Sequence, residues 1–216
     1  MSELQKENHP FLDFVSKNKK VLTYTVTAIA VALVAFFGYA ELYQKPREEK
    51  AADAMFTAEK YFAMDSSSLV LNGDGQSKGV LYIIKEFGGT KAANLAKYYA
   101  GISYLNLGDY ENALSHLSKF SGSDEIVSSM ALGAMGDAHS ELGNLDKGIS
   151  FYKKAANNSK NEYTGAMFLM KAAAAYESKG EAKSAKGLYE QVKKNYPDNN
   201  QTRDIDKYIA RAEANL

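Results

Sequence analysis

Apolar residues recur at helical spacing on both sides of a glycine turn in the segment YLNLGDYENAL, residues 104–114. One apolar stripe ends just before Gly108. A second stripe begins at Tyr110 and continues at the i+3, i+4 and i+7 positions as far as Leu117. Glycine between two such stripes marks a turn. The pattern therefore predicts a pair of helices, and because one pair cannot bury its own apolar face, it directs attention to further copies.

The pattern returns twice, as HSELGNLDKGI at residues 139–149 and as YESKGEAKSAK at residues 176–186. The turn glycines Gly108, Gly143 and Gly180 are 35 and 37 residues apart. Each copy has a small residue seven positions before its turn glycine, a small residue five positions after it, and an aromatic or large apolar residue nine positions after it. These residues are Gly101, Gly136 and Ala173, then Ala113, Gly148 and Ala185, then Leu117, Tyr152 and Tyr189. Small side chains predict a close crossing of the two helices in every copy.

Repeats with this period and pattern resemble the tetratricopeptide repeat (TPR), a helical hairpin that stacks into a solenoid. The resemblance covers residues 91–200 and implies three TPR-like repeats. Upstream, an apolar helical stripe, a polar loop from Asp65 to Ser77 and the segment GVLYIIKEFGG predict a degenerate first hairpin over residues 47–90. Residues 201–216 carry a further apolar stripe and predict a C-terminal capping helix.

Residues 21–40, VLTYTVTAIAVALVAFFGYA, contain no charged side chain. As a helix they would span about 30 Å, the thickness of a bilayer core. We therefore expect a transmembrane helix over residues 21–43, after a short basic-edged leader at residues 1–20. The complete fold prediction is all-α: a TPR-like α-solenoid of about four helical hairpins plus a capping helix, on one N-terminal transmembrane helix.

The orientation of this helix follows from Lys17, Lys19 and Lys20 at its N-terminal edge, since basic residues favour the cytoplasmic side. This predicts a single-pass inner (plasma) membrane protein with a cytoplasmic N-terminus and a periplasmic or extracytoplasmic TPR domain. A cleaved signal peptide is the alternative, because the segment 38–40 has small residues at cleavage spacing. The apolar stretch is longer than a signal-peptide core, which favours a retained anchor.

Composition excludes several kinds of chemistry. The 216 residues include 26 basic and 26 acidic side chains, so no net charge favours nucleic acid. Cysteine is absent, which excludes disulfides, thiolate metal sites and a cysteine nucleophile. The histidines, His9, His116 and His139, have no partner at metal-ligand spacing. The glycine-rich segment 72–79 fits neither a phosphate-binding nor a calcium-binding loop. We expect no enzyme activity, cofactor, metal or small-molecule substrate.

In the TPR family, partners usually bind along the concave face formed by the first helix of each repeat. The positions that line this groove correspond here to Tyr98, Ile102 and Leu105, to Gly133, Asp137 and Ser140, and to Met170, Ala174 and Glu177. The candidate partner-binding residues are Tyr98, Ile102, Leu105, Asp137, Met170 and Glu177. The lysine and asparagine residues that clamp a terminal carboxylate in some TPR domains are missing at these positions. An apolar-to-acidic groove would suit extended or partly folded polypeptide. Tyr98 and Met170 are equally compatible with packing inside the repeats.

A short leader, one membrane helix and an exported TPR domain also resemble, in layout, the ancillary subunit family of the Sec translocon. That resemblance implies a non-enzymatic, chaperone-like scaffold that binds other proteins and assists protein export or envelope assembly, with translocon subunits among its partners. The alternative is a signal-cleaved, soluble periplasmic TPR coordinator of envelope or cell-division machinery. An envelope enzyme or enzyme regulator is the least supported hypothesis, because no catalytic constellation is present in the sequence.

Overall fold

The computed structural model describes residues 10–159, 161–197, 199 and 202–216. The first nine residues of the predicted leader, including His9, lie outside them. The chain divides into two compact units, of which the first ends at Glu49 and the second begins at Lys50. Within the described residues the fold is all-α, and the β pairing there is an isolated bridge between Gly73 and Lys78. The prediction of an all-α, solenoid-like protein is confirmed.

The first unit contains α1 (Pro10–Lys17), α2 (Lys19–Tyr39) and a π-helical turn, η1 (Ala40–Gln44), and it includes the start of α3 (Lys45–Ala63). No residue of α2 is buried. The helical stretch that contains α2 is the one candidate, within the described part of the chain, that is long and apolar enough to cross a membrane. The predicted transmembrane segment, residues 21–43, lies inside α2 and η1.

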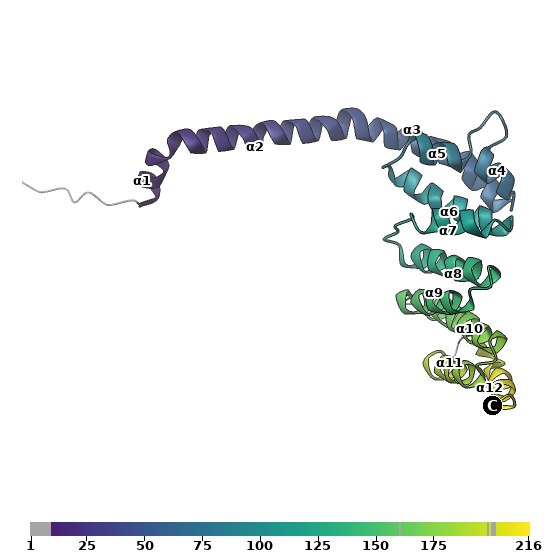
Figure 1. The fold of residues 1–216 in the computed structure, drawn as a ribbon. Helices are drawn as coiled ribbons and strands as arrows, with labels where there is room; N and C mark the ends of the chain where they lie inside the picture. Colours follow the sequence, from purple (N-terminus) through teal and green to yellow (C-terminus); the bar gives the residue numbers. More distant parts are fainter. Residues whose placement is uncertain (1–9, 160, 198, 200–201) are drawn as a thin grey trace, which may run out of the picture. The chain divides into compact units, whose positions relative to one another are not determined.

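The second unit is a stack of helices in chain order (Figure 1). After α3 come α4 (Ser67–Asn72), α5 (Val80–Glu86), α6 (Lys91–Asn106), α7 (Tyr110–Leu117), α8 (Glu125–Glu141), α9 (Leu145–Asn158), α10 (Glu162–Ser178), α11 (Ala182–Asn195) and α12 (Ile205–Glu213). The three predicted repeats are the pairs α6–α7, α8–α9 and α10–α11. In each pair we call α6, α8 and α10 the first helix and α7, α9 and α11 the second helix.

The turn glycines end all three first helices in the same way. Gly108, Gly143 and Gly180 have φ values of 77°, 74° and 75°, a left-handed conformation that costs glycine little. The next residue in each turn donates its backbone N–H to a carbonyl five residues back: Asp109 to Tyr104 at 2.9 Å, Asn144 to His139 at 2.8 Å and Glu181 to Tyr176 at 2.9 Å. These bonds satisfy carbonyls that a helix end otherwise leaves unpaired. The glycine spacing in the sequence therefore marks the point where the first helix of each repeat ends.

The small residues lie at the close helix crossings. A Cβ atom on Gly136 would lie 2.6 Å from the Tyr152 ring and 3.2 Å from the Gly148 carbonyl oxygen. A Cβ atom on Gly101 would lie 2.4 Å from Cγ of Leu117. All three distances are shorter than an ordinary van der Waals contact, so a larger residue fits only if the second helix or its side chain moves.

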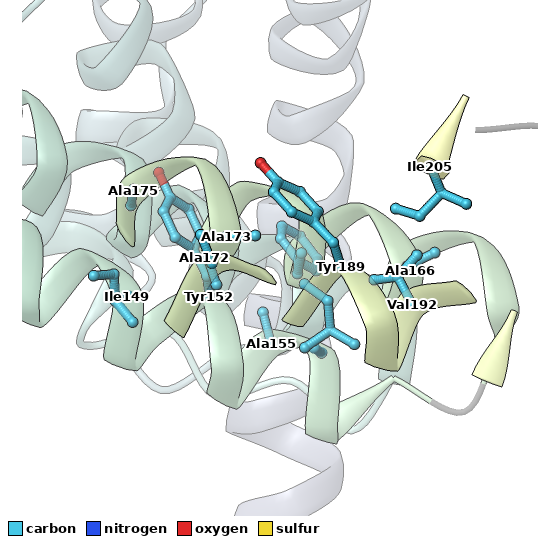
Figure 2. Close-up of a cluster of buried hydrophobic side chains, with 14 of the residues drawn as sticks. Ile149, Tyr152, Ala155, Ala166, Ala172, Ala173, Ala175, Tyr189, Val192 and Ile205 are labelled. Carbon is cyan, nitrogen blue, oxygen red and sulfur yellow. The ribbon is translucent and has the colours of Figure 1, made fainter. Parts of the chain in front are cut away.

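Two larger cores hold the stack together. One lies among α9, α10, α11 and α12, where Tyr152, Phe168 and Tyr189 are buried among many alanines (Figure 2). The other joins α3, α4, α5 and α6 and includes Val70 and Ile83. A smaller cluster, around Leu117, Ala131 and Ala134, joins α7 to α8.

The predicted polar loop from Asp65 to Ser77 is wrong over part of its length, because α4 forms inside it. Val70 and Leu71 are buried in the second core, which explains the helix. The apolar run is too short to show a helical period in the sequence. The remaining loop is held by Asp74, which accepts hydrogen bonds from the backbone N–H groups of Gln76 and Ser77 and from the Tyr61 hydroxyl.

Candidate partner-binding face

The first helices present one common face. On α8, residues 126, 130, 133 and 137 follow the i, i+4, i+7, i+11 spacing of a single helical face, and the equivalent positions recur on α6 and α10. We call this surface of α6, α8 and α10 the first-helix face. Tyr98, Ile102, Asp137 and Met170 occupy these positions, and Leu105 and Glu177 lie three residues further along the same helices.

Side-chain caps fix where each of these helices begins. Thr90, Asp124 and Asn161 precede α6, α8 and α10, and each side chain accepts a hydrogen bond from the backbone N–H three residues later. An N-cap of this kind satisfies a donor that would otherwise be unpaired at the helix start. The first turn of each helix, and the side chains that it carries, are therefore held in a defined register.

Tyr98, Ile102 and Leu105, all on α6, are partly buried and pack against the small cluster around Leu117. The Tyr98 ring centroid lies 5.6 Å from that of Phe120, and burial raises the pKa of its hydroxyl. Met170 on α10 is likewise partly buried against the large core. These side chains contribute to packing and also reach the surface.

Asp137 is the centre of a polar contact that joins three helices. Its carboxylate accepts hydrogen bonds from Lys171 Nζ on α10, at 2.7 and 2.8 Å, and from the Tyr152 hydroxyl on α9, at 2.7 Å. Burial, together with the hydrogen bond to Asp137, raises the pKa of Tyr152 well above its ordinary value, so the hydroxyl remains protonated.

Glu177 makes the equivalent contact one repeat later. It accepts hydrogen bonds from Arg211 on α12, at 2.5 and 3.0 Å, and from the Tyr189 hydroxyl on α11, at 2.9 Å. Burial acts to raise the pKa of Glu177, but the hydrogen bonds from Arg211 and Tyr189 lower it overall. Figure 2 shows Tyr152 and Tyr189 with their hydroxyls on the same side of the core.

These contacts change the electrostatics of the expected groove. Both predicted acidic residues, Asp137 and Glu177, are already paired with a basic side chain of the next first helix or of the cap. The sequence analysis did not identify Lys171 and Arg211, because they come from neighbouring helices. The first-helix face is therefore apolar with neutralised ion pairs, rather than apolar-to-acidic.

Three further apolar residues of this face are exposed to solvent and were missed. Ile126 and Tyr163 each lie 17 residues before their turn glycines, and 54% and 60% of their surfaces are exposed. Met130 lies one turn after Ile126 and is 36% exposed. The equal spacing of Ile126 and Tyr163 from their turn glycines was the available signal, but all three residues precede the family positions used to select the groove.

A pocket opens on the other side of α8, away from the first-helix face, where α7 is short. α7 has 8 residues, whereas α9 and α11 each have 14. The chain after Leu117 leaves the helical path and borders a cavity of about 360 Å³, whose lining includes Leu117, Phe120, Met135 and Phe151. Its walls come from α7, α8, α9 and the loop between α7 and α8.

The two described histidines stack on aromatic rings rather than approaching acidic residues. The His116 ring lies 5.4 Å from that of Tyr104, and the His139 ring lies 5.2 Å from that of Phe151. Burial lowers the pKa of both imidazoles. Within the residues that the structure describes, no group of three His, Asp or Glu side chains could hold a metal ion.

Stacked helical hairpins with glycine turns, tight small-residue crossings and a shared first-helix face define a repeat scaffold for protein–protein interaction. Family models described as tetratricopeptide repeat match residues 95–122, 131–162 and 168–199. The chain is a TPR protein, and repeats of this family are in general non-catalytic scaffolds that bind other proteins. No curated protein matches the chain.

Proposed function

We propose that this protein is a non-enzymatic, membrane-anchored scaffold that binds extended or partly folded polypeptide on its first-helix face. The observation that carries the proposal is the row of exposed apolar side chains, Ile126, Met130 and Tyr163, on the face that also carries the predicted groove residues. Exposed apolar side chains that recur on one surface are typical of a protein-binding site.

The chemistry of the face supports an apolar rather than a charged ligand. Asp137 and Glu177 already have basic partners, so a charged peptide would have to compete with Lys171 or Arg211. Methionine side chains such as Met130 and Met170 adapt to ligands of different shape. Segments that expose apolar side chains, as unfolded or newly exported chains do, are therefore the ligands that we assign to this face.

The anchor forms the second part of the proposal. The organisation we propose is a leader at 1–20, a transmembrane helix at 21–43, a degenerate hairpin at 47–90, repeats at 91–200 and a cap at 201–216. Helix α2, which is exposed and carries no charge from Val21 onward, supports a retained anchor in a bacterial inner membrane, with the repeats outside the cytoplasm. In that position the scaffold would assist export through the Sec translocon or assembly of envelope proteins.

Site-specific photo-crosslinking in intact cells tests the binding face. A crosslinker at Tyr163 should capture translocon subunits or exported chains, whereas one at the exposed Lys153 on α9 should not. Equal capture from both positions would contradict the assignment of the face. Carbonate extraction tests the anchor, since a retained helix keeps the full-length chain in the membrane pellet. A soluble chain that begins near Glu41 would instead establish the signal-cleaved periplasmic coordinator.

A further inference from the structure

The short helix α1 is separated from the apolar helix α2 by a break at Asn18. The backbone of Asn18 leaves α-helical geometry, with φ −107° and ψ 15°. Its side-chain amide and its backbone N–H both donate to the Phe14 carbonyl oxygen, at 2.9 and 3.0 Å. This contact satisfies a carbonyl at the end of α1 and lets the chain change direction without exposing it.

One face of α1 is apolar, and its two aromatic rings are exposed. Phe11, Phe14 and Val15 follow the i, i+3, i+4 spacing of a single helical face. The Phe11 side chain is 73% exposed and that of Phe14 is 58% exposed. Two aromatic rings this exposed, next to a helix suited to a bilayer, favour an apolar environment along α1 as well.

Positive charge is concentrated where α1 meets α2. Lys17, Lys19 and Lys20 are all exposed, and no acidic residue occurs between Asp13 and Glu41. Lysines beside an apolar helical face are the usual features of a helix that lies in the headgroup region of an anionic membrane. The three lysines have the charge to complement lipid phosphates, and α1 directly precedes the apolar helix α2 in the chain.

We propose that α1 is an interfacial helix, with Phe11, Phe14 and Val15 in the headgroup–acyl boundary and Lys17, Lys19 and Lys20 on anionic phospholipid headgroups. The proposal rests on the membrane anchor of the proposed function. It adds a second, lipid-selective contact on the side of the membrane that faces away from the repeats. The break at Asn18 allows α1 to lie along the surface while α2 crosses the bilayer.

The chain contains no tryptophan, so a single introduced tryptophan reports one position. The full-length protein is reconstituted into phosphatidylcholine vesicles with or without phosphatidylglycerol, using lipids brominated at shallow or deep acyl positions. Phe14→Trp should emit at short wavelength and be quenched most by shallow bromine. Leu33→Trp, in the middle of α2, should be quenched most by deep bromine.

The outcomes separate this proposal from the anchor itself. Deep quenching of the Leu33→Trp variant with water-like, unquenched emission from Phe14→Trp would overturn the interfacial helix and leave the anchor in place. Loss of deep quenching in Leu33→Trp would overturn the anchor. Emission from Phe14→Trp that is blue-shifted but unaffected by bromolipid would place α1 against protein, a second copy included, and would also overturn the proposal.

Charge variants test the lipid preference. Changing Lys17, Lys19 and Lys20 to glutamine in the Phe14→Trp background should lower quenching in anionic vesicles by about half or more, and should leave zwitterionic vesicles little changed. The matched control changes Lys45, Arg47 and Lys50 to glutamine, on the other side of α2, and should leave the Phe14→Trp signal unchanged. Quenching that is equal in both vesicle types before any lysine is replaced would overturn the assignment to anionic headgroups.

Discussion

The Tyr152 hydroxyl donates a hydrogen bond to the Asp137 carboxylate at 2.7 Å, from the second helix of a repeat to its first helix. Lys171 then connects the same carboxylate to the next repeat. Tyr189 and Glu177 have the same relationship one repeat later. Each carboxylate thus fixes the crossing inside its repeat and the contact with the following helix.

Replacing Asp137 should therefore destabilise the stack. Asp137→Ala leaves Lys171 and Tyr152 without their shared acceptor and should lower the free energy of unfolding by about 1–2 kcal/mol. Asp206→Ala is the matched control, because Asp206 also accepts from a lysine at 2.7 Å, but both members of that pair are largely exposed. Asp206→Ala should lower the free energy of unfolding by less than about 1 kcal/mol. Urea unfolding compares the two, and equal losses would show that the Asp137 contact is an ordinary surface pair.

Replacing two of the helical glycines should change the stability of the fold in opposite directions. Gly136→Leu places a side chain where even a Cβ atom is 2.6 Å from Tyr152, and should cost about 1–3 kcal/mol or more. A Cβ atom on Gly187, on α11, would meet nothing within 4 Å beyond the backbone of its own helix, so Gly187→Ala should stabilise the helix by about 0.5–1 kcal/mol. Lys153→Ala, on an exposed position, should change stability by less than about 0.5 kcal/mol. Thermal or urea unfolding that ranks the variants otherwise would contradict the helix register.

The repeat period could be predicted because glycine has a local reason to be at each turn. Gly108, Gly143 and Gly180 need a left-handed backbone, and the small residues need room at the crossings. Lys171 and Arg211 could not be predicted as partners of Asp137 and Glu177, since those pairs are 34 residues apart and depend on how neighbouring helices rotate. Helix α4 was missed for a related reason: tertiary burial, not local pattern, stabilises it.

The partly buried histidines His116 and His139 should make the folded protein less stable on mild acidification. Burial lowers the pKa of His116 and His139 in the folded state, with smaller contributions from Lys119 and Lys147. Between about pH 6.5 and these lower values the unfolded chain binds more protons than the folded chain, so stability decreases as pH falls. The pKa of Glu177 is also lowered, so its carboxylate stays charged at mildly acidic pH.

Urea unfolding midpoints at about pH 7.5 and about pH 5.5 measure this effect, because only histidine ordinarily changes charge in that interval. The double variant His116→Gln, His139→Gln should show a smaller drop between the two pH values. His9→Gln, in the leader, should keep the full drop. A drop of the same size in the double variant would assign the acid sensitivity to other groups.

Substitutions on the first-helix face should fall into two groups: those that weaken binding alone and those that also lower the melting temperature. Tyr163→Ala removes an exposed ring and should weaken binding of a permanently unfolded model polypeptide by about 5–30-fold with an unchanged melting temperature. Tyr98→Ala and Met170→Ala should lower the melting temperature as well, since both side chains pack in the stack. Tyr82→Ala, on α5, is the control and should leave binding unchanged. Fluorescence anisotropy measures binding and thermal melting measures stability for the same variants. Full binding by Tyr163→Ala would show that the polypeptide binds outside the first-helix face.

Because α7 is short, the stack should resist a pulling force less well at α7 and α8 than in its two larger cores. Between the core of α3 to α6 and the core of α9 to α12, the chain relies on the small cluster around Leu117 and on a wall that is partly open. Local opening requires least free energy where few apolar contacts are lost. Tension along the chain would therefore separate the stack at α7 and α8 first, and the α9–α12 core would remain folded as a second block. The contact between α7 and α8 would therefore break under tension before either of the two larger cores unfolds.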